Sequence, residues 1–124
     1  MADKNAAEVS TAEFQSVKTG IVEAVEGEEE AVAKLREIVA ILPANCEDLA
    51  EDECNDNLNR VLEDADASAK DAALLISMIA DNGKFVEIKP AYAKNMVTGF
   101  IRLNGQTVGC VANRSVVYDE EGNE

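Results

Sequence analysis

The dipeptide Asn104-Gly105 constrains the fold of this chain more than any other feature of the sequence. It separates two apolar-rich runs within the stretch MVTGFIRLNGQTVGCVAN, residues 96–113. Asparagine and glycine both tolerate the positive φ angles of a two-residue type I′ turn, and such a turn between apolar runs is the strongest short-range hairpin signal. The sequence therefore predicts a β-hairpin over residues 97–112.

Folding the hairpin about this turn also sets which residues lie opposite each other. One face of the ribbon is then apolar along nearly its whole length, with the pairs Ile101 and Val108, Gly99 and Cys110, and Val97 and Ala112. The other face pairs Arg102 with Thr107, Phe100 with Gly109 and Thr98 with Val111. Since neither face is plainly polar, we expect the ribbon to be covered on both sides within a larger α/β structure.

The residues before the hairpin alternate between strand and helix patterns. The capping box Ser10-Thr11-Ala12-Glu13 predicts a short helix over 11–17, and the run 21–25 has the alternation of a strand. Residues 28–41 place apolar side chains at helical spacing behind three glutamates, and Pro43 ends that helix. This order of strand and helix is typical of an α/β layer fold.

Further elements are predicted nearer the hairpin. We expect a short helix over 57–64, a second helix that Ser68-Ala69-Lys70-Asp71 caps and that runs to Ala80, and a strand over 84–89. The second helix carries its predicted core stripe at Leu74, Leu75, Met78 and Ile79. After the hairpin, residues 116–118 have the pattern of a strand and 119–123 that of a turn.

The segment from Cys46 to Asp56 carries six acids and no base. A cation site is one reading of it, but no glycine falls at the position that a calcium loop of the EF-hand type requires. A solvated linker is the other reading, and charged loops of this kind are common. We interpret the segment as a linker and as the best candidate for a domain boundary.

The charge balance argues against several classes of partner. Eleven basic and twenty-five acidic residues give a net charge of −14, whereas nucleic acid and anionic membranes both require a basic surface. The longest mostly apolar run, residues 72–80, is far shorter than the ~20 residues of a membrane-spanning helix. The start MADKNAAEVS has no secretory signal pattern. We therefore expect a cytoplasmic protein with no nucleic-acid partner and no direct membrane insertion.

Cysteine is scarce in this chain and histidine is absent. The three cysteines, Cys46, Cys54 and Cys110, lack C-x-x-C spacing, and the chain has no histidine. Neither a structural zinc site nor a histidine-activated nucleophile is therefore predicted. Cys110 lies on the apolar face of the ribbon, where the expected role is that of a small buried hydrophobe. We assign no catalytic residue and no metal ligand from the sequence.

Two separated blocks of the sequence resemble one enzyme family. The stretch FVEIKPAYAKNMVTGFIRLNGQTVGCVANRS, residues 85–115, is similar to the start of the C-terminal half of the carboxyltransferase subunit of biotin-dependent acyl-CoA carboxylases and of the related acyl-CoA decarboxylases. The segment Tyr92 to Asn95 and the run Gly99 to Asn113 carry this likeness. The block LREIVAILPAN, residues 35–45, resembles the helix and Leu-Pro-x-Asn exit of the N-terminal half. Arg114-Ser115 departs from the Gln-Pro that usually follows in the family.

The resemblance implies a partial crotonase-like α/β fold of helices plus the hairpin 97–112. Residues 1–45 would end the N-terminal half, 46–68 would form the acidic linker and a short helix, and 69–124 would begin a truncated C-terminal half. Such enzymes move a carboxyl group between carboxybiotin and an acyl-CoA of the acetyl-, propionyl- or methylmalonyl-CoA type. Biotin is carried by a separate biotin carboxyl carrier protein or domain.

The resemblance also implies how the reaction is catalysed. Pairs of backbone amides stabilise the enolates of biotin and of the acyl-CoA. The glycine-rich segments that supply these amides in the family lie outside this chain. We therefore expect the isolated chain to be inactive and the full-length form to be a homo-oligomer.

The candidate substrate-facing residues lie on the ribbon. Ala112 and Asn113 leave a strand end, which is where α/β sheets bind ligands, although Asn113 could instead only cap a turn. Arg102 could touch a CoA phosphate, or it could be a solvated or interface charge. A rival interpretation is a small non-catalytic assembly module that reuses the ribbon. A monomer with a sharp cooperative melt would favour the module, and aggregation or a molten profile would favour the fragment.

Overall fold

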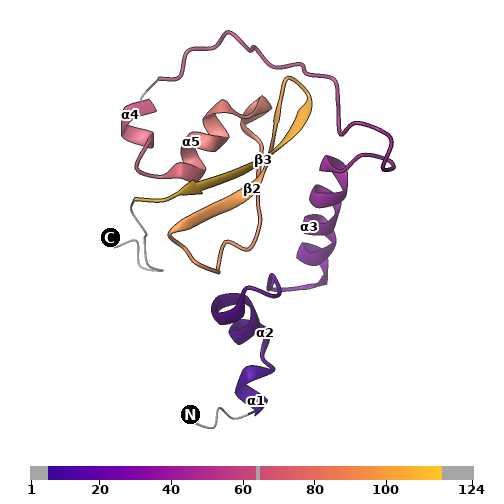
Figure 1. Cartoon of the computed structure of the whole chain (residues 1–124), viewed down its shortest axis with the longest axis vertical. Coiled ribbons are helices and arrows are strands. Elements are labelled where there is room, and N and C mark those ends of the chain that lie inside the picture. Colours follow the sequence, from indigo (N-terminus) through magenta and orange to yellow (C-terminus); the bar gives the residue numbers. More distant parts are fainter. Residues whose placement is uncertain (1–5, 64, 116–124) are drawn as a thin grey trace.

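A three-stranded antiparallel sheet lies in the upper part of the view in Figure 1, and the first helices of the chain extend away below it. The computed structural model describes residues 6–63 and 65–115. The strands are β1 (Phe85–Glu87), β2 (Met96–Leu103) and β3 (Gln106–Asn113), in the order β1-β2-β3. The helices are α1 (Ala6–Val9), α2 (Ala12–Phe14), α3 (Glu28–Ile41), α4 (Ala65–Ser68) and α5 (Ala72–Ile79), with a π-helical turn η1 (Gln15–Thr19) and a 3-10 turn η2 (Asp81–Gly83).

The hairpin forms with the predicted turn and register. Asn104 and Gly105 have φ angles of 52° and 81°, the positive values that a type I′ turn requires. All of the predicted cross-strand pairs are present, and the pairing extends to Met96 opposite Asn113 at the open end. β1 pairs with the other edge of β2, so the strand predicted over 84–89 is confirmed in its central residues.

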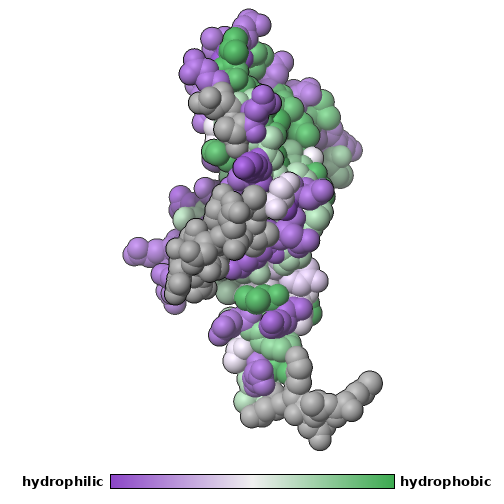
Figure 2. All heavy atoms as spheres, turned by 90° about the vertical axis from the view of Figure 1, so that its left-hand side faces the viewer, coloured by the Kyte–Doolittle hydropathy of each residue, from purple (hydrophilic) through white to green (hydrophobic). Residues whose placement is uncertain are grey.

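The core lies between α5 and one face of the sheet. Its buried cluster consists of Ala72, Ile76, Ala80, Val97 and Ile101. The predicted core stripe of α5 was wrong, because none of its four residues belongs to this cluster and Leu74 and Ile79 are exposed. The helix AALLISMI is apolar nearly all round, so helical spacing could not select the buried face, and the small alanines allow close approach to the sheet. Figure 2 shows apolar side chains (green) reaching the surface in the upper half of the molecule, where Figure 1 places α5.

The ribbon is covered mainly on one face, which corrects the expectation of cover on both sides. Val111 lies on the second face and is 75% exposed. On that face the described residues cover the end near the turn, where Arg102 and Thr107 bond to the last carbonyls of α3. Val108, on the face that α5 covers, is still 37% exposed, since β3 is an outer strand of the sheet.

Two predicted elements are wrong. Residues 21–25 form no strand, because no strand among the described residues pairs with them, and Glu23 bonds instead to Lys34 and to the backbone N–H of Lys89. Residues 57–63 form no helix. The N–H of Asn59 donates to the side chain of Asn57, and a local turn of this kind competes with helix formation. The strand and turn predicted over 116–123 lie outside the described residues.

The helix boundaries follow the predicted signals with small shifts. Thr11 rather than Ser10 caps the first helical region, where its Oγ1 accepts from the N–H of Phe14 (3.2 Å). Asp71 rather than Ser68 caps α5. α3 ends before Pro43 as predicted, with Leu42 already extended. Within the described ranges, every helix is too short or too polar to span a bilayer.

Candidate functional site

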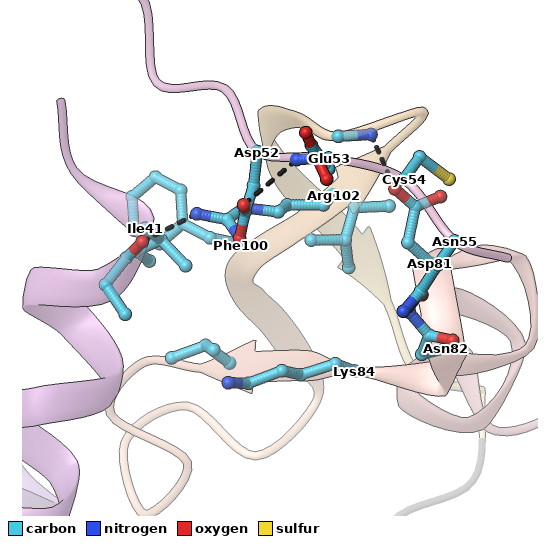
Figure 3. A pocket seen from close by; sticks show the side chains of 14 residues that line it. Ile41, Asp52, Glu53, Cys54, Asn55, Asp81, Asn82, Lys84, Phe100 and Arg102 are labelled. Atoms are coloured by element: carbon cyan, nitrogen blue, oxygen red, sulfur yellow. Dashed lines mark hydrogen bonds and ion pairs between the residues drawn. The ribbon is translucent and has the colours of Figure 1, made fainter.

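A buried carboxylate holds the turn of the hairpin. Asp81 follows α5 closely and is buried. Its two oxygens accept hydrogen bonds from the backbone N–H groups of Asn104 (3.0 Å) and Gly105 (2.7 Å). Figure 3 shows Asp81 beside the turn, among the side chains that line a cavity. Asp81 therefore fixes the tip of the hairpin against the end of α5.

The acidic segment runs along the outer edge of the same tip. The N–H of Asp52 donates to the carbonyl of Gly105, and the N–H of Thr107 donates to the carbonyl of Ala50, both at 2.9 Å. An isolated antiparallel bridge results, centred on Glu51. The segment is exposed at most positions, as a linker would be, but the sequence did not predict this attachment to β3.

Arg102 joins three parts of the chain. Its guanidinium pairs with the carboxylate of Asp52 and donates to the carbonyl of Ala40 near the end of α3 (2.6 Å). Its Nε is buried and has no hydrogen-bond partner in the part of the chain that the structure describes. Figure 3 shows the side chain of Arg102 beside that of Asp52 and close to the end of α3. Arg102 is therefore a partly buried charge that bonds within this chain.

A cavity of about 220 Å³ lies where α3, the acidic segment, η2 and the sheet meet. Its acidic lining residues are Asp52, Glu53 and Asp81, and its bases are Lys84 and Arg102. Arg102 is already bound by a carboxylate and a carbonyl, so its charge is not free for a second anion. With three acids and two bases in its lining, the cavity lacks the cluster of bases that would attract CoA phosphates.

The predicted substrate-facing residues lie toward the other end of the ribbon. Asn113 is exposed and paired with Met96, whereas Ala112 packs against the core. Ala112 lies five residues along β3 from Thr107, the cross-strand partner of Arg102, a distance of about 17 Å at the rise of a strand. Ala112 and Asn113 are consecutive residues that face opposite sides of β3, and both lie far from Arg102.

Arg114 anchors this exit, a role that the sequence did not reveal. Its Nε donates to Asp71 (3.0 Å), its Nη1 donates to the carbonyl of Lys94 (3.3 Å), and its Nη2 lies 3.7 Å from the carboxylate of Glu87. Asp71 is also the N-cap of α5, so Arg114 ties the end of β3 to the start of that helix. The one signal in the sequence was that Arg114 stands where the resembled family usually has glutamine.

A further polar contact joins α3 to the sheet. The Nζ of Lys34 donates to the carbonyl of Glu87 (2.6 Å) and pairs with the carboxylate of Glu23 (3.2 Å). Glu23 also accepts from the backbone N–H of Lys89 (3.0 Å), whose own Nζ donates to the carbonyl of Gly20. These bonds hold the segment before α3 against the end of β1.

The cysteine on the ribbon is unactivated. Cys110 packs against the buried cluster, in line with its predicted role as a small hydrophobe. Burial raises the pKa of the Cys110 thiol, because desolvation disfavours the thiolate. Residues 6–63 and 65–115 contain no group of three or more Cys, Asp or Glu side chains placed to hold a metal ion.

The fold and these contacts define a segment of an α/β layered domain, in which one helix covers a face of an antiparallel sheet. A family model described as the carboxyl transferase domain matches residues 3–119. The chain therefore belongs to the carboxyl transferase domain family.

Individual relatives agree with this assignment. The propionyl-CoA carboxylase beta chain of Roseobacter denitrificans is 35% identical over 122 residues, which cover 91% of this chain and 24% of the relative. The methylmalonyl-CoA decarboxylase subunit alpha of Veillonella parvula is 33% identical over 102 residues, which cover 76% of this chain and 20% of the relative. The chain thus spans a fifth to a quarter of the length of these relatives.

A solved structure shows the same fold. The crystal structure of transcarboxylase 12S, described as a hexamer assembly with hydrolysed methylmalonyl-coenzyme A bound, has a TM-score of 0.71 and 30% sequence identity. The match covers 90% of this chain and 24% of that chain. The predicted fold class, a partial crotonase-like α/β structure, is confirmed.

Proposed function

We propose that this chain forms one segment of a biotin-dependent carboxyltransferase that moves a carboxyl group between carboxybiotin and an acyl-CoA. The observation that carries the proposal is the match of the carboxyl transferase domain to residues 3–119. The names of the relatives specify propionyl-CoA and methylmalonyl-CoA, which supports an acyl-CoA of this type as the substrate class. A biotin carboxyl carrier protein is the proposed partner, and a cytoplasmic homo-oligomer is the proposed full-length form.

The boundary between two crotonase-like halves is proposed to lie in the acidic segment. Residues 1–45 would then end the first half, 46–68 would connect, and 69–124 would begin the second. In support, residues 46–63 contain no helix, and the polar contacts between them and the described part of the sheet are one isolated bridge, one ion pair and one side-chain hydrogen bond. Arg102 and Lys34 would hold the two halves together, since each bonds across this boundary.

The described residues position other parts of such an enzyme rather than perform its chemistry. Carboxybiotin would supply the carboxyl group, and the cavity, with three acids and two bases in its lining, is not proposed as its site. Paired backbone N–H groups are the donors that stabilise an enolate. The pair at Asn104 and Gly105 already donates to Asp81, so it is not available to a substrate. We therefore expect the isolated 124-residue chain to transfer no carboxyl group.

A chimera tests the proposed function directly. The matched 122-residue segment of the Roseobacter denitrificans propionyl-CoA carboxylase beta chain would be replaced by this chain, and carboxyl transfer to propionyl-CoA would be measured with the carboxylase's other components. The proposal expects measurable transfer by the chimera and none by the isolated chain. A folded but inactive chimera would contradict the proposal, as would transfer by the isolated chain.

The ribbon exit remains the proposed place where this chain faces substrate. In the chimera, Asn113→Asp would put a negative charge beside the incoming CoA phosphates, and we expect KM for the acyl-CoA to rise severalfold with kcat little changed. Asn59→Asp, in the exposed loop before α4, is the matched control. Equal KM values for the two variants would remove Asn113 from the substrate site.

Solution behaviour of the isolated chain separates the enzyme segment from an assembly module. The segment predicts a broad melt with dye-accessible apolar surface, because several apolar rows are exposed. A monomer that melts sharply in calorimetry would favour the module instead.

A further inference from the structure

The exposed apolar stripe of α3 consists of Val32, Leu35 and Val39, and Leu42, the extended residue directly after the helix, adds a fourth exposed aliphatic side chain. These four side chains are 50%, 60%, 58% and 56% exposed, and the spacing of three and four residues from Val32 to Val39 places the helical residues on one side of α3. Val32 and Val39 are seven residues apart, or about 10 Å along the helix. Soluble proteins seldom leave a continuous row of large aliphatic side chains uncovered, so the stripe is a candidate docking surface.

Contacts on the other side of α3 determine which way the stripe faces. Lys34, midway along the helix, donates to the backbone of β1 (2.6 Å). At the C-terminal end, the carbonyls of Ala40 and Ile41 accept from Arg102 (2.6 Å) and Thr107 (3.0 Å). Turning the stripe toward its own sheet would break all three bonds, so the sheet of this chain cannot cover the stripe while these contacts are kept.

Both ends of the stripe are acidic. α3 begins with the exposed residues Glu28, Glu29 and Glu30. Beyond the other end, Glu47 and Asp48 line the same hollow as Leu42. α3 contains two bases, and Lys34 is paired with Glu23. Arg36 is the other base of the helix, so the acidic side chains outnumber the bases near the stripe.

This charge pattern disfavours a second copy of the chain as the occupant. Parallel pairing would place the three glutamates that begin α3 against those of the copy. Antiparallel pairing would place them against Glu47 and Asp48 of the copy. The net charge of −14 on each chain adds further repulsion.

We infer that the α3 stripe docks a different amphipathic helix, one whose apolar row is flanked by lysine or arginine. The source of this helix is the part of the carboxyltransferase that lies outside the quarter of the relatives matched by this chain. The inference rests on the proposed function for its source, whereas the chemistry of the helix follows from the stripe and its acidic ends. Basic residues at the rim would complement these ends and exclude like-charged competitors.

The chemistry of the surface is tested on the intact 124-residue chain. Two stapled helical peptides share one leucine row and differ in a lysine or glutamate rim. The lysine-rimmed peptide is expected to bind at least about tenfold more tightly, and Leu35→Glu in the chain is expected to weaken it by about tenfold or more. Ala33→Glu, at an exposed position of α3 outside the stripe, is the matched control and should not weaken binding.

Three results of this titration would overturn the inference. They are equal affinity for the two peptides, binding of neither, and an equal effect of the Leu35 and Ala33 variants. Sedimentation of the chain alone could give a fourth contradicting result, which is a dimer that Leu35→Glu dissociates and Ala33→Glu does not. A second copy of the chain would then occupy the stripe.

The source of the helix is tested in the chimera described above. There Leu35→Glu should lower Tm by about 5 °C or more, while Ala33→Glu should change it little. An active chimera that is insensitive at Leu35 would overturn the docking inference and leave the proposed function standing. A folded but inactive chimera whose Tm falls on Leu35→Glu would overturn the proposed function and leave the docking inference standing. If the chimera does not fold, the peptide titration decides the inference.

Discussion

Charged side chains join the parts of this molecule that lie far apart in the sequence. Arg102 ties β2 to the acidic segment and to α3, Lys34 ties α3 to β1, and Asp81 ties the end of α5 to the hairpin turn. Each bonds to backbone groups of a distant part of the chain. Removal of one such side chain therefore costs more than the loss of a surface charge.

Asp81→Ala should lower the free energy of unfolding by about 3 kcal/mol, because two backbone N–H groups at the turn lose a charged acceptor. Urea unfolding measures the change. Glu37→Ala, which removes an exposed carboxylate on α3, is the control and should change stability by less than about 0.5 kcal/mol. Equal effects of the two substitutions would show that Asp81 does not hold the turn.

Asp56 should make stability depend on pH in the acid range. The backbone N–H of Asn82 (2.8 Å), with help from the Arg60 guanidinium, holds the pKa of Asp56 below its usual 3.8. The unfolded chain then binds more protons as pH falls below about 4, so the stabilisation is present above that pH and is lost as pH falls through the folded pKa. The urea midpoint of the wild type should fall more steeply from pH 5 to pH 2 than that of Asp56→Asn. Parallel curves would contradict this assignment.

At the scale of single elements, the two interior glycines of the hairpin are not equivalent. A Cβ at Gly99 would lie 2.3 Å from the carbonyl oxygen of Val86 and 2.5 Å from the ring of Phe85. A Cβ at Gly109 would lie 3.8 Å from the ring of Phe100, an ordinary contact. The close pairing of β1 with β2 therefore requires glycine at position 99 but not at position 109.

Gly99→Ala should destabilise the protein by about 1–3 kcal/mol through overpacking and should speed amide exchange in β1. Gly109→Ala should be neutral or slightly stabilising, by about 0.5 kcal/mol, since alanine reduces the freedom of the unfolded chain. Hydrogen exchange and urea unfolding of the pair provide the comparison. A loss of β1 protection in both variants would contradict the geometry.

At the scale of the whole molecule, a small core carries a large net charge. The buried apolar side chains among the described residues are Ile41, Ala72, Ile76, Ala80, Val86, Val97 and Ile101. Several of the ion pairs are partly exposed, and such pairs contribute little to stability. We therefore expect repulsion among the excess carboxylates of a chain with net charge −14 to outweigh the ion pairs.

Salt should accordingly stabilise the isolated chain. Raising NaCl from about 10 mM to 0.5 M shortens the screening length from about 30 Å to a few ångströms, which weakens the repulsion more than the short ion pairs. We expect Tm, measured by circular dichroism, to rise by several degrees, and an uncharged osmolyte of equal osmolality provides the control. A fall in Tm would show that the ion pairs dominate.

The sequence by itself determined the hairpin, its register and the bounds of α3. These features depend on neighbours within a few residues: the positive φ of Asn104-Gly105, alternation along two strands, and the stop at Pro43. The motif residues along the ribbon also sufficed to identify the family, which the match over residues 3–119 confirmed.

Only the tertiary structure decided which face of α5 is buried, why residues 21–25 form no strand, and how Asp81, Arg102 and Arg114 are used. Each outcome depends on groups that approach from far along the chain, such as the bond between Thr107 and Ile41, which lie 66 residues apart. Local propensity restricts the backbone over one or two turns, whereas burial and charge pairing are set by which partner comes within reach. For this reason the ribbon could be read from its own residues and its surroundings could not.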